Sequence, residues 1–113
     1  MKYHQDALAI DKEIGYRQGE ANQLGNIGLI YSDKGDLDNA MKYHQDALAI
    51  DKEIGYRQGE ANQLGNIGLI YSVKGDLDNA LKFFKEALII FKKIGAKREI
   101  KIVEQNIKEI QKK

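Results

Sequence analysis

Residues 41–80 read MKYHQDALAIDKEIGYRQGEANQLGNIGLIYSVKGDLDNA, and residues 1–40 repeat them with a single change, Asp33 in place of Val73. A third, degenerate copy begins at Leu81. Self-similarity at a period of about 40 residues is typical of stacked helical units or propeller blades, not of one closed globule. The repeat therefore predicts a modular fold that presents surfaces to partners.

The pattern within the repeat is helical. Glycine recurs every 20 residues, at positions 15, 35, 55, 75 and 95. Each of these glycines is expected just past a helix end, and Asp36 and Asp76 are expected to cap the helices that follow. Apolar residues between them keep helical spacing without strand alternation. We predict six helices, at about residues 2–14, 17–34, 37–54, 57–74, 77–94 and 97–112. Loops of two or three residues make neighbours antiparallel, so the expected fold is all-α, a right-handed α-solenoid of antiparallel helix hairpins.

The expected organisation is one domain over residues 1–113. Residues 1–15 supply the second helix of a partial repeat, residues 16–55 and 56–95 are full repeats, and residues 96–113 form a C-terminal capping helix. Because the first helix lacks its hairpin partner, its apolar face is a candidate for self-association, through Ala7, Leu8, Ile10 and Ile14. The near identity of the first two copies leaves two origins open, recent duplication and an engineered or truncated fragment of a longer array.

Composition restricts the partners. The chain has no cysteine and no proline, which excludes disulfides and thiolate metal sites and favours a reducing compartment such as the cytoplasm. No apolar run approaches the ~20 residues that span a bilayer, so no membrane is expected. Residues 1–40 and 41–80 carry net charges of −3 and −2, and residues 81–113 carry +6. The acidic repeats argue against nucleic acid. The lysine-rich end is interpreted as a solvated cap, with head-to-tail attraction or an acidic partner as the alternative.

No catalytic constellation is visible. The chain has no phosphate-cradling glycine loop of the usual spacing and no evident nucleophile with its base, so neither enzymatic activity nor a cofactor is expected. His4 and His44 share one register, and the third copy places Phe84 there. That replacement indicates a packing position that requires bulk, not a metal ligand, and we expect no metal.

The repeat resembles the tetratricopeptide repeat. The residues that carry the resemblance in the first full unit are Leu24, Ile27, Gly28, Tyr31, Gly35, Asp36, Ala40, His44 and Ala47. The second unit repeats them as Leu64, Ile67, Gly68, Tyr71, Gly75, Asp76, Ala80, Phe84 and Ala87. The common form has 34 residues and often ends in proline; the 40-residue form is similar to the repeats of Pins-type adaptors and kinesin light chains. The resemblance implies a scaffold for protein–protein interaction.

Asparagines are the main candidates for binding. Asn26, Asn66 and Asn106 lie 40 residues apart in one register, and Asn22 and Asn62 precede the first two by one helical turn. The resemblance implies that the first helix of each pair lines a concave groove, where an asparagine grips a peptide backbone. The side-chain amide suits this role because it both donates and accepts hydrogen bonds. Duplication of ordinary polar residues is the alternative, although it does not explain Asn106.

Four further residues are expected at this groove, Gly25, Gly65, Leu29 and Leu69. A glycine within a helix costs roughly 1 kcal/mol relative to alanine. Close approach of a ligand backbone and close contact with a neighbouring helix are both open as reasons for Gly25 and Gly65. The difference between Asp33 and Val73 is expected to alter the groove floor or its edge.

Arg17, Arg57 and Lys97 form a second ladder with the same period and are possible anchors for acidic side chains. Arg57 is about half a turn out of phase with Asn66, so the ladder can equally lie outside the groove. The leading hypothesis is a scaffold that binds an extended peptide through the asparagines. The alternative is a self-associating module, a dimer or swapped oligomer formed through the uncovered first helix.

Overall fold

The computed structural model describes residues 16–112, which form five helices. These are α2 (Arg17–Asp33), α3 (Leu37–Ile54), α4 (Arg57–Val73), α5 (Leu77–Ile94) and α6 (Lys97–Gln111). Each lies within a residue of the bounds predicted from the sequence. The predicted helix over residues 2–14 lies outside the described residues. None of the five helices is long and apolar enough to cross a membrane.

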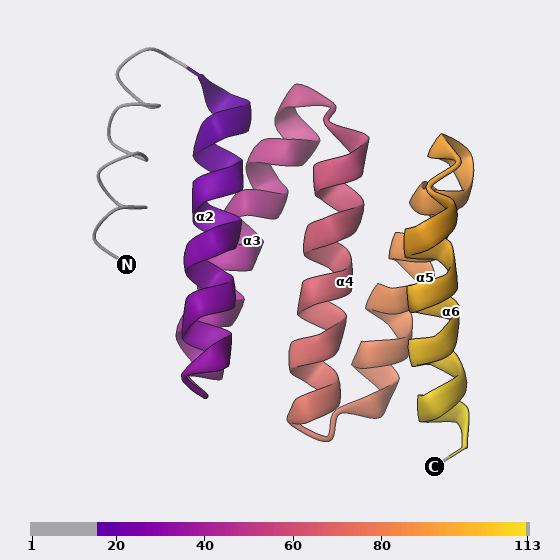
Figure 1. Ribbon diagram of the computed structural model, residues 1–113. Coiled ribbons are helices and arrows are strands. Elements are labelled where there is room, and N and C mark those ends of the chain that lie inside the picture. Colours follow the sequence, from indigo (N-terminus) through magenta and orange to yellow (C-terminus); the bar gives the residue numbers. More distant parts are fainter. Residues whose placement is uncertain (1–15, 113) are drawn as a thin grey trace.

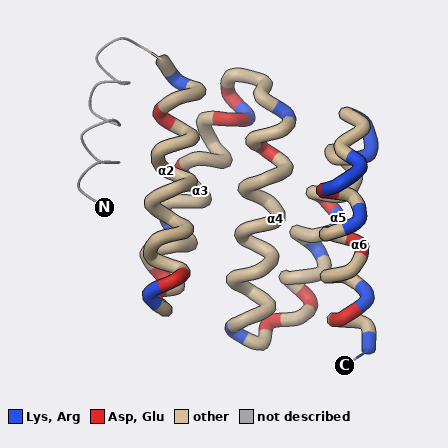
Figure 2. Tube along the Cα trace, in the orientation of Figure 1, with Lys and Arg blue, Asp and Glu red and all other residues tan. Residues whose placement is uncertain are grey.

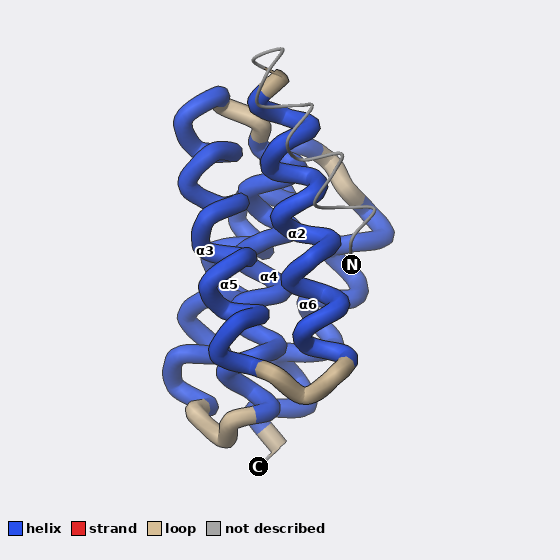
Figure 3. Tube along the Cα trace, turned by 90° about the vertical axis from the view of Figure 1, so that its left-hand side faces the viewer, coloured by secondary structure: helices blue, strands red, loops and turns tan. Residues whose placement is uncertain are grey.

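The helices are stacked as antiparallel hairpins in two layers (Figures 1 and 3). The most extensive packing lies within the hairpins α2–α3 and α4–α5. The hairpins join because α3 packs on α4, α5 packs on α6, and α2 contacts α4. Helices α2, α4 and α6 form one layer, and α3 and α5 form the other. The predicted α-solenoid is confirmed, with no strand in residues 16–112.

Short-range chemistry sets the turns, as the sequence predicted. Gly55 and Gly95 end α3 and α5 with φ near +72°, a left-handed conformation that costs glycine little. The side chains of Asp36 and Asp76 accept from the backbone N–H of Asn39 and Asn79 at 3.2 and 3.3 Å. These bonds satisfy amide groups that the first turn of a helix leaves unpaired.

Small and aromatic residues hold each hairpin together. Six alanines are completely buried and let the helices approach closely: Ala21, Ala40, Ala47, Ala61, Ala80 and Ala87. Tyr31 stacks on Tyr43 in the first hairpin, and Tyr71 stacks on Phe83 in the second, each with ring centroids 5.4 Å apart. These aromatic residues are therefore packing residues that join the two layers.

Candidate functional site

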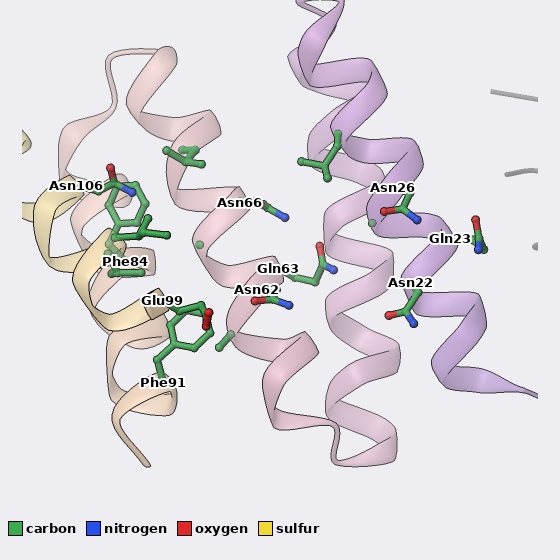
Figure 4. Close-up of a pocket in the computed structure, with 17 residues that line it drawn as sticks. Asn22, Gln23, Asn26, Asn62, Gln63, Asn66, Phe84, Phe91, Glu99 and Asn106 are labelled. Atoms are coloured by element: carbon green, nitrogen blue, oxygen red, sulfur yellow. The ribbon is translucent and has the colours of Figure 1, made fainter. Parts of the chain in front are cut away.

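A groove with a volume of about 630 Å³ crosses the layer of α2, α4 and α6 (Figure 4). All nine residues predicted to bind a peptide line it: Asn22, Gly25, Asn26, Leu29, Asn62, Gly65, Asn66, Leu69 and Asn106. The sequence reasoning missed the other eight lining residues: Gln23, Ala61, Gln63, Phe84, Phe91, Glu99, Ile102 and Val103. Several of them could have been found by the 40-residue register, because Ile102 and Val103 occupy the positions of Asn62 and Gln63.

The asparagines form two rows that run across the helices. Asn26, Asn66 and Asn106 make one row over α2, α4 and α6, and Asn22 and Asn62 make the second, one turn earlier (Figure 4). Within the described residues, the side chains of the first row make no hydrogen bond, whereas Asn62 accepts one from Gln58 at 3.2 Å. The first row therefore has amide donors and acceptors available for a ligand.

The two groove glycines differ in what surrounds them. A Cβ added to Gly25 would lie 2.7 Å from Nε2 of Gln63, whereas a Cβ added to Gly65 would meet nothing within 4 Å. The reason is the register, since the residue that follows Gln63 by 40 positions is the shorter Val103. Contact with a neighbouring helix thus accounts for Gly25, and Gly65 leaves open space at the groove floor.

His44 and Gln63 form a buried polar pair beneath the groove. His44 is 1% exposed, and its Nδ1 lies 2.8 Å from Oε1 of Gln63. Because an amide oxygen only accepts, Nδ1 is the donor. Burial lowers the pKa of His44, so the ring is held neutral, and the hydrogen bond to Gln63 partly opposes this effect. Its ring also packs against Gly28, as Phe84 packs against Gly68, which agrees with the predicted packing role.

Asp51 is a buried acid near the end of α3. It is 1% exposed, and its Oδ1 has no hydrogen-bond partner within the described residues. Burial, together with the nearby carboxylate of Glu60, raises the pKa of Asp51 from 3.8 to about 6, and burial is the larger cause. Residues 16–112 contain no group of three or more His, Cys, Asp or Glu side chains arranged to hold a metal ion.

The structure does not bring the cationic ladder into the groove. Arg17 pairs with Glu20, and Arg57 pairs with Glu60, each with an N–O distance of 2.7 Å. Neither arginine lines the groove, and Lys97 does not line it either. The arginines instead neutralise two acids whose side chains are largely buried, a structural task at the start of α2 and α4.

Two other expectations have different outcomes. Asp33 and Val73 were expected at the groove floor or edge, but the lining ends at Leu29 and Leu69, one turn before them. Val73 is 72% exposed, at the end of α4. The residues predicted for self-association lie outside the described part of the chain; they are Ala7, Leu8, Ile10 and Ile14.

Comparison with known proteins agrees with this architecture. Two models of the tetratricopeptide repeat match, one over residues 23–55 and one over residues 64–90. The structure is similar to the crystal structure of BtubC (BKLC) from P. vanneervenii, with a TM-score of 0.68 and 19% sequence identity over 97% of this chain. The chain spans 54% of the length of that chain, and at this identity the likeness shows the fold alone. No curated protein matched the sequence. The chain belongs to the tetratricopeptide repeat family, a family of non-enzymatic scaffolds whose repeats mediate protein–protein interaction.

Proposed function

We propose that this chain binds an extended peptide segment of a partner protein in the groove across α2, α4 and α6. The observation that carries the proposal is the row of Asn26, Asn66 and Asn106, three side-chain amides in one groove with no hydrogen bond inside the described residues. Each amide can pair with a peptide N–H and a peptide C=O at once. Such pairing is independent of the ligand's side chains, which suits an extended main chain.

The spacing of the row sets the length of the ligand. Packed helices lie about 8–10 Å apart, and α2, α4 and α6 contact one another only weakly, so successive asparagines lie at least that far apart. An extended peptide rises about 3.3 Å per residue, so the row spans at least about six or seven ligand residues, with one asparagine to every three residues or more. Leu29 and Leu69, which are 45% and 46% exposed beside the asparagines, offer apolar contacts to the ligand's side chains. A groove this short buries less area than a standard interface, so we expect a micromolar or weaker Kd.

The test is selection from a phage-displayed library of random dodecapeptides. Wild-type protein is compared with a variant that carries Asn26→Ala, Asn66→Ala and Asn106→Ala. The matched control carries Gln45→Ala and Lys85→Ala, two exposed positions in the layer of α3 and α5. We expect peptides that bind the wild type and the control and bind the asparagine variant at least tenfold more weakly, at equal helicity by circular dichroism. Equal binding by all three proteins would exclude the asparagine row as the binding element.

Self-association through the segment that contains Ala7, Leu8, Ile10 and Ile14 is a second proposal, and it rests on the sequence alone. It predicts a mass above that of a monomer in light scattering over a range of concentrations. A variant with Leu8→Ser and Ile10→Ser should then shift the mass toward the monomer. Self-association at this segment is compatible with peptide binding in the groove.

A further inference from the structure

The α6 end of the groove differs from the rest in its chemistry. Where α4 carries Gly59, Asn62 and Gln63, α6 carries Glu99, Ile102 and Val103 in the same register. The second layer changes in parallel, because Phe84 and Phe91 replace His44 and Asp51. The groove is therefore lined mainly by amides between α2 and α4, whereas its α6 side presents apolar side chains and one acid beside Asn106 (Figure 4).

The apolar part of the groove, called the apolar wall below, lies on tightly packed core side chains. Phe91 is 3% exposed and Val103 is 4% exposed, so both are fixed by the core and only their edges reach the groove. Ile102 is 50% exposed and stands beside them as the accessible surface. A ligand side chain that lies here gains apolar contact along its length, but the packed floor leaves no deep pocket for a bulky ring.

Glu99 supplies the charge. The stretches of α2 and α4 that line the groove, residues 22–29 and 61–69, contain no Lys, Arg, Asp or Glu, as the tan middle of both helices shows (Figure 2). Glu99 is the one charged residue among the groove's lining residues. It is half-buried, and it forms no ion pair within residues 16–112. Lys97, Arg98 and Lys101 are close in sequence but exposed, and none of them lines the groove.

We propose that the α6 end of the groove is a side-chain subsite for a lysine or arginine of the bound peptide, whose aliphatic stem lies along Ile102 and over the edge of Phe91 and whose cationic head pairs with Glu99. The inference rests on the proposed function and adds a specificity to it. Lysine and arginine combine an apolar stem with a charged tip, which is the combination that this end of the groove presents. An aliphatic ligand side chain would leave Glu99 without a partner as it loses water, and an acidic one would be repelled.

The chemistry also predicts which end of the peptide carries selectivity. Between α2 and α4 the groove offers uncharged amides, which read the main chain and tolerate most side chains. At α6 one ligand position meets the carboxylate of Glu99. Selected peptides should therefore share one basic position near one end and vary elsewhere.

The experiment extends the dodecapeptide selection. The library is selected against the wild type, Glu99→Gln and Glu99→Lys, and a wild-type peptide is resynthesised with its shared basic residue replaced by norleucine. We expect lysine or arginine at one position for the wild type, loss of that preference for Glu99→Gln, and aspartate or glutamate at that position for Glu99→Lys. The norleucine peptide should bind the wild type about tenfold more weakly and bind Glu99→Gln as well as its parent does.

The apolar wall has its own control. Ile102→Asn restores the residue that α4 carries at Asn62, so it removes the wall without introducing a foreign side chain. It should weaken the basic peptide severalfold and leave the effect of Asn66→Ala unchanged.

The outcomes separate the two proposals. Peptides whose binding depends on the asparagines but that show no shared basic residue, or an acidic one, would overturn the subsite and leave the groove standing. Selected peptides that ignore the asparagines, or no selected peptides at all, would overturn the proposed function and the subsite with it. The norleucine comparison on the wild type requires no variant of the chain, so it holds even if Glu99→Gln were to fold poorly.

Discussion

Changing Asp51 to asparagine should stabilise the protein at neutral pH. Asp51 is 1% exposed, lies in the last turn of α3, and has an Oδ1 without a partner in the described residues. At pH 7.5 its carboxylate is ionised in this site, close to Glu60 and to the negative end of the helix dipole. Asparagine keeps the size and shape of the side chain and removes the charge.

The magnitude follows from the pKa of Asp51. Its rise from 3.8 to about 6 corresponds to roughly 3 kcal/mol of lost stability when the group is fully ionised, at about 1.4 kcal/mol per pKa unit. We expect Asp51→Asn to recover about 1–3 kcal/mol at pH 7.5, since the site can relax and admit water. The third repeat supports this sign, because Phe91 fills the same register without a charge and is 3% exposed.

The pH dependence gives the decisive signature. A carboxyl whose pKa is higher in the folded state than in the unfolded state holds its proton more tightly when folded, so its contribution to stability falls as pH rises from about 4 to about 6. The difference in free energy of unfolding between Asp51→Asn and wild type should therefore shrink by about 2 kcal/mol when the pH falls from 7.5 to 4.5. Urea unfolding of both proteins at the two pH values measures it. Asp46→Asn, at an exposed position of the same helix, is the control and should change stability by less than about 0.5 kcal/mol. A difference between Asp51→Asn and wild type that did not vary with pH would refute the reasoning.

Three further predictions concern stability and are checked by the same unfolding measurement. Gly65→Ala should stabilise the protein by up to about 1 kcal/mol because the added Cβ meets nothing within 4 Å. Gly68→Ala should destabilise it by about 1–3 kcal/mol because the added Cβ would lie 2.9 Å from the ring of Phe84. Equal effects of the two substitutions would contradict the assigned packing. Asp76→Ala should cost about 1 kcal/mol, since it removes the cap on the amide of Asn79, and an unchanged midpoint would show that the cap is dispensable. His44→Phe alone should destabilise the protein by about 1–3 kcal/mol because it leaves the buried amide of Gln63 without its partner. Adding Gln63→Val should restore stability, because the double variant then carries the pair that Phe84 and Val103 form in the next repeat. Additive losses would argue against the buried pair.

The local structure could be predicted closely from the sequence. The bounds of α3 and α5 coincide with the expected ones because the signals that set them are contained in a few consecutive residues. Asp36 and Asp76 cap the amides three residues ahead, and Gly55 and Gly95 take the left-handed turn, whatever the rest of the chain does. The predicted groove residues came together for a related reason. Positions 40 residues apart fall on the same face of equivalent helices once the hairpins stack.

The environments of single side chains could not be predicted in this way. Gly25 and Gly65 have the same local sequence, yet one meets Gln63 and the other meets open space. Arg17 and Arg57 repeat with the asparagines but pair with Glu20 and Glu60 outside the groove lining. These outcomes depend on which residue of a neighbouring helix faces the position.

What the sequence alone determined is the repeating scaffold: five described helices, their short turns and the face that carries the asparagines. Caps, glycine turns and helical periodicity are short-range properties, and a nearly exact repeat copies them. What only the tertiary structure decided is which polar groups are buried, that Asp51 loses its water, and that Glu99 and Ile102 end the groove. Those properties arise between helices whose contacting residues lie many positions apart in the chain, and they differ at α6 because the third copy changes both sides of the contact.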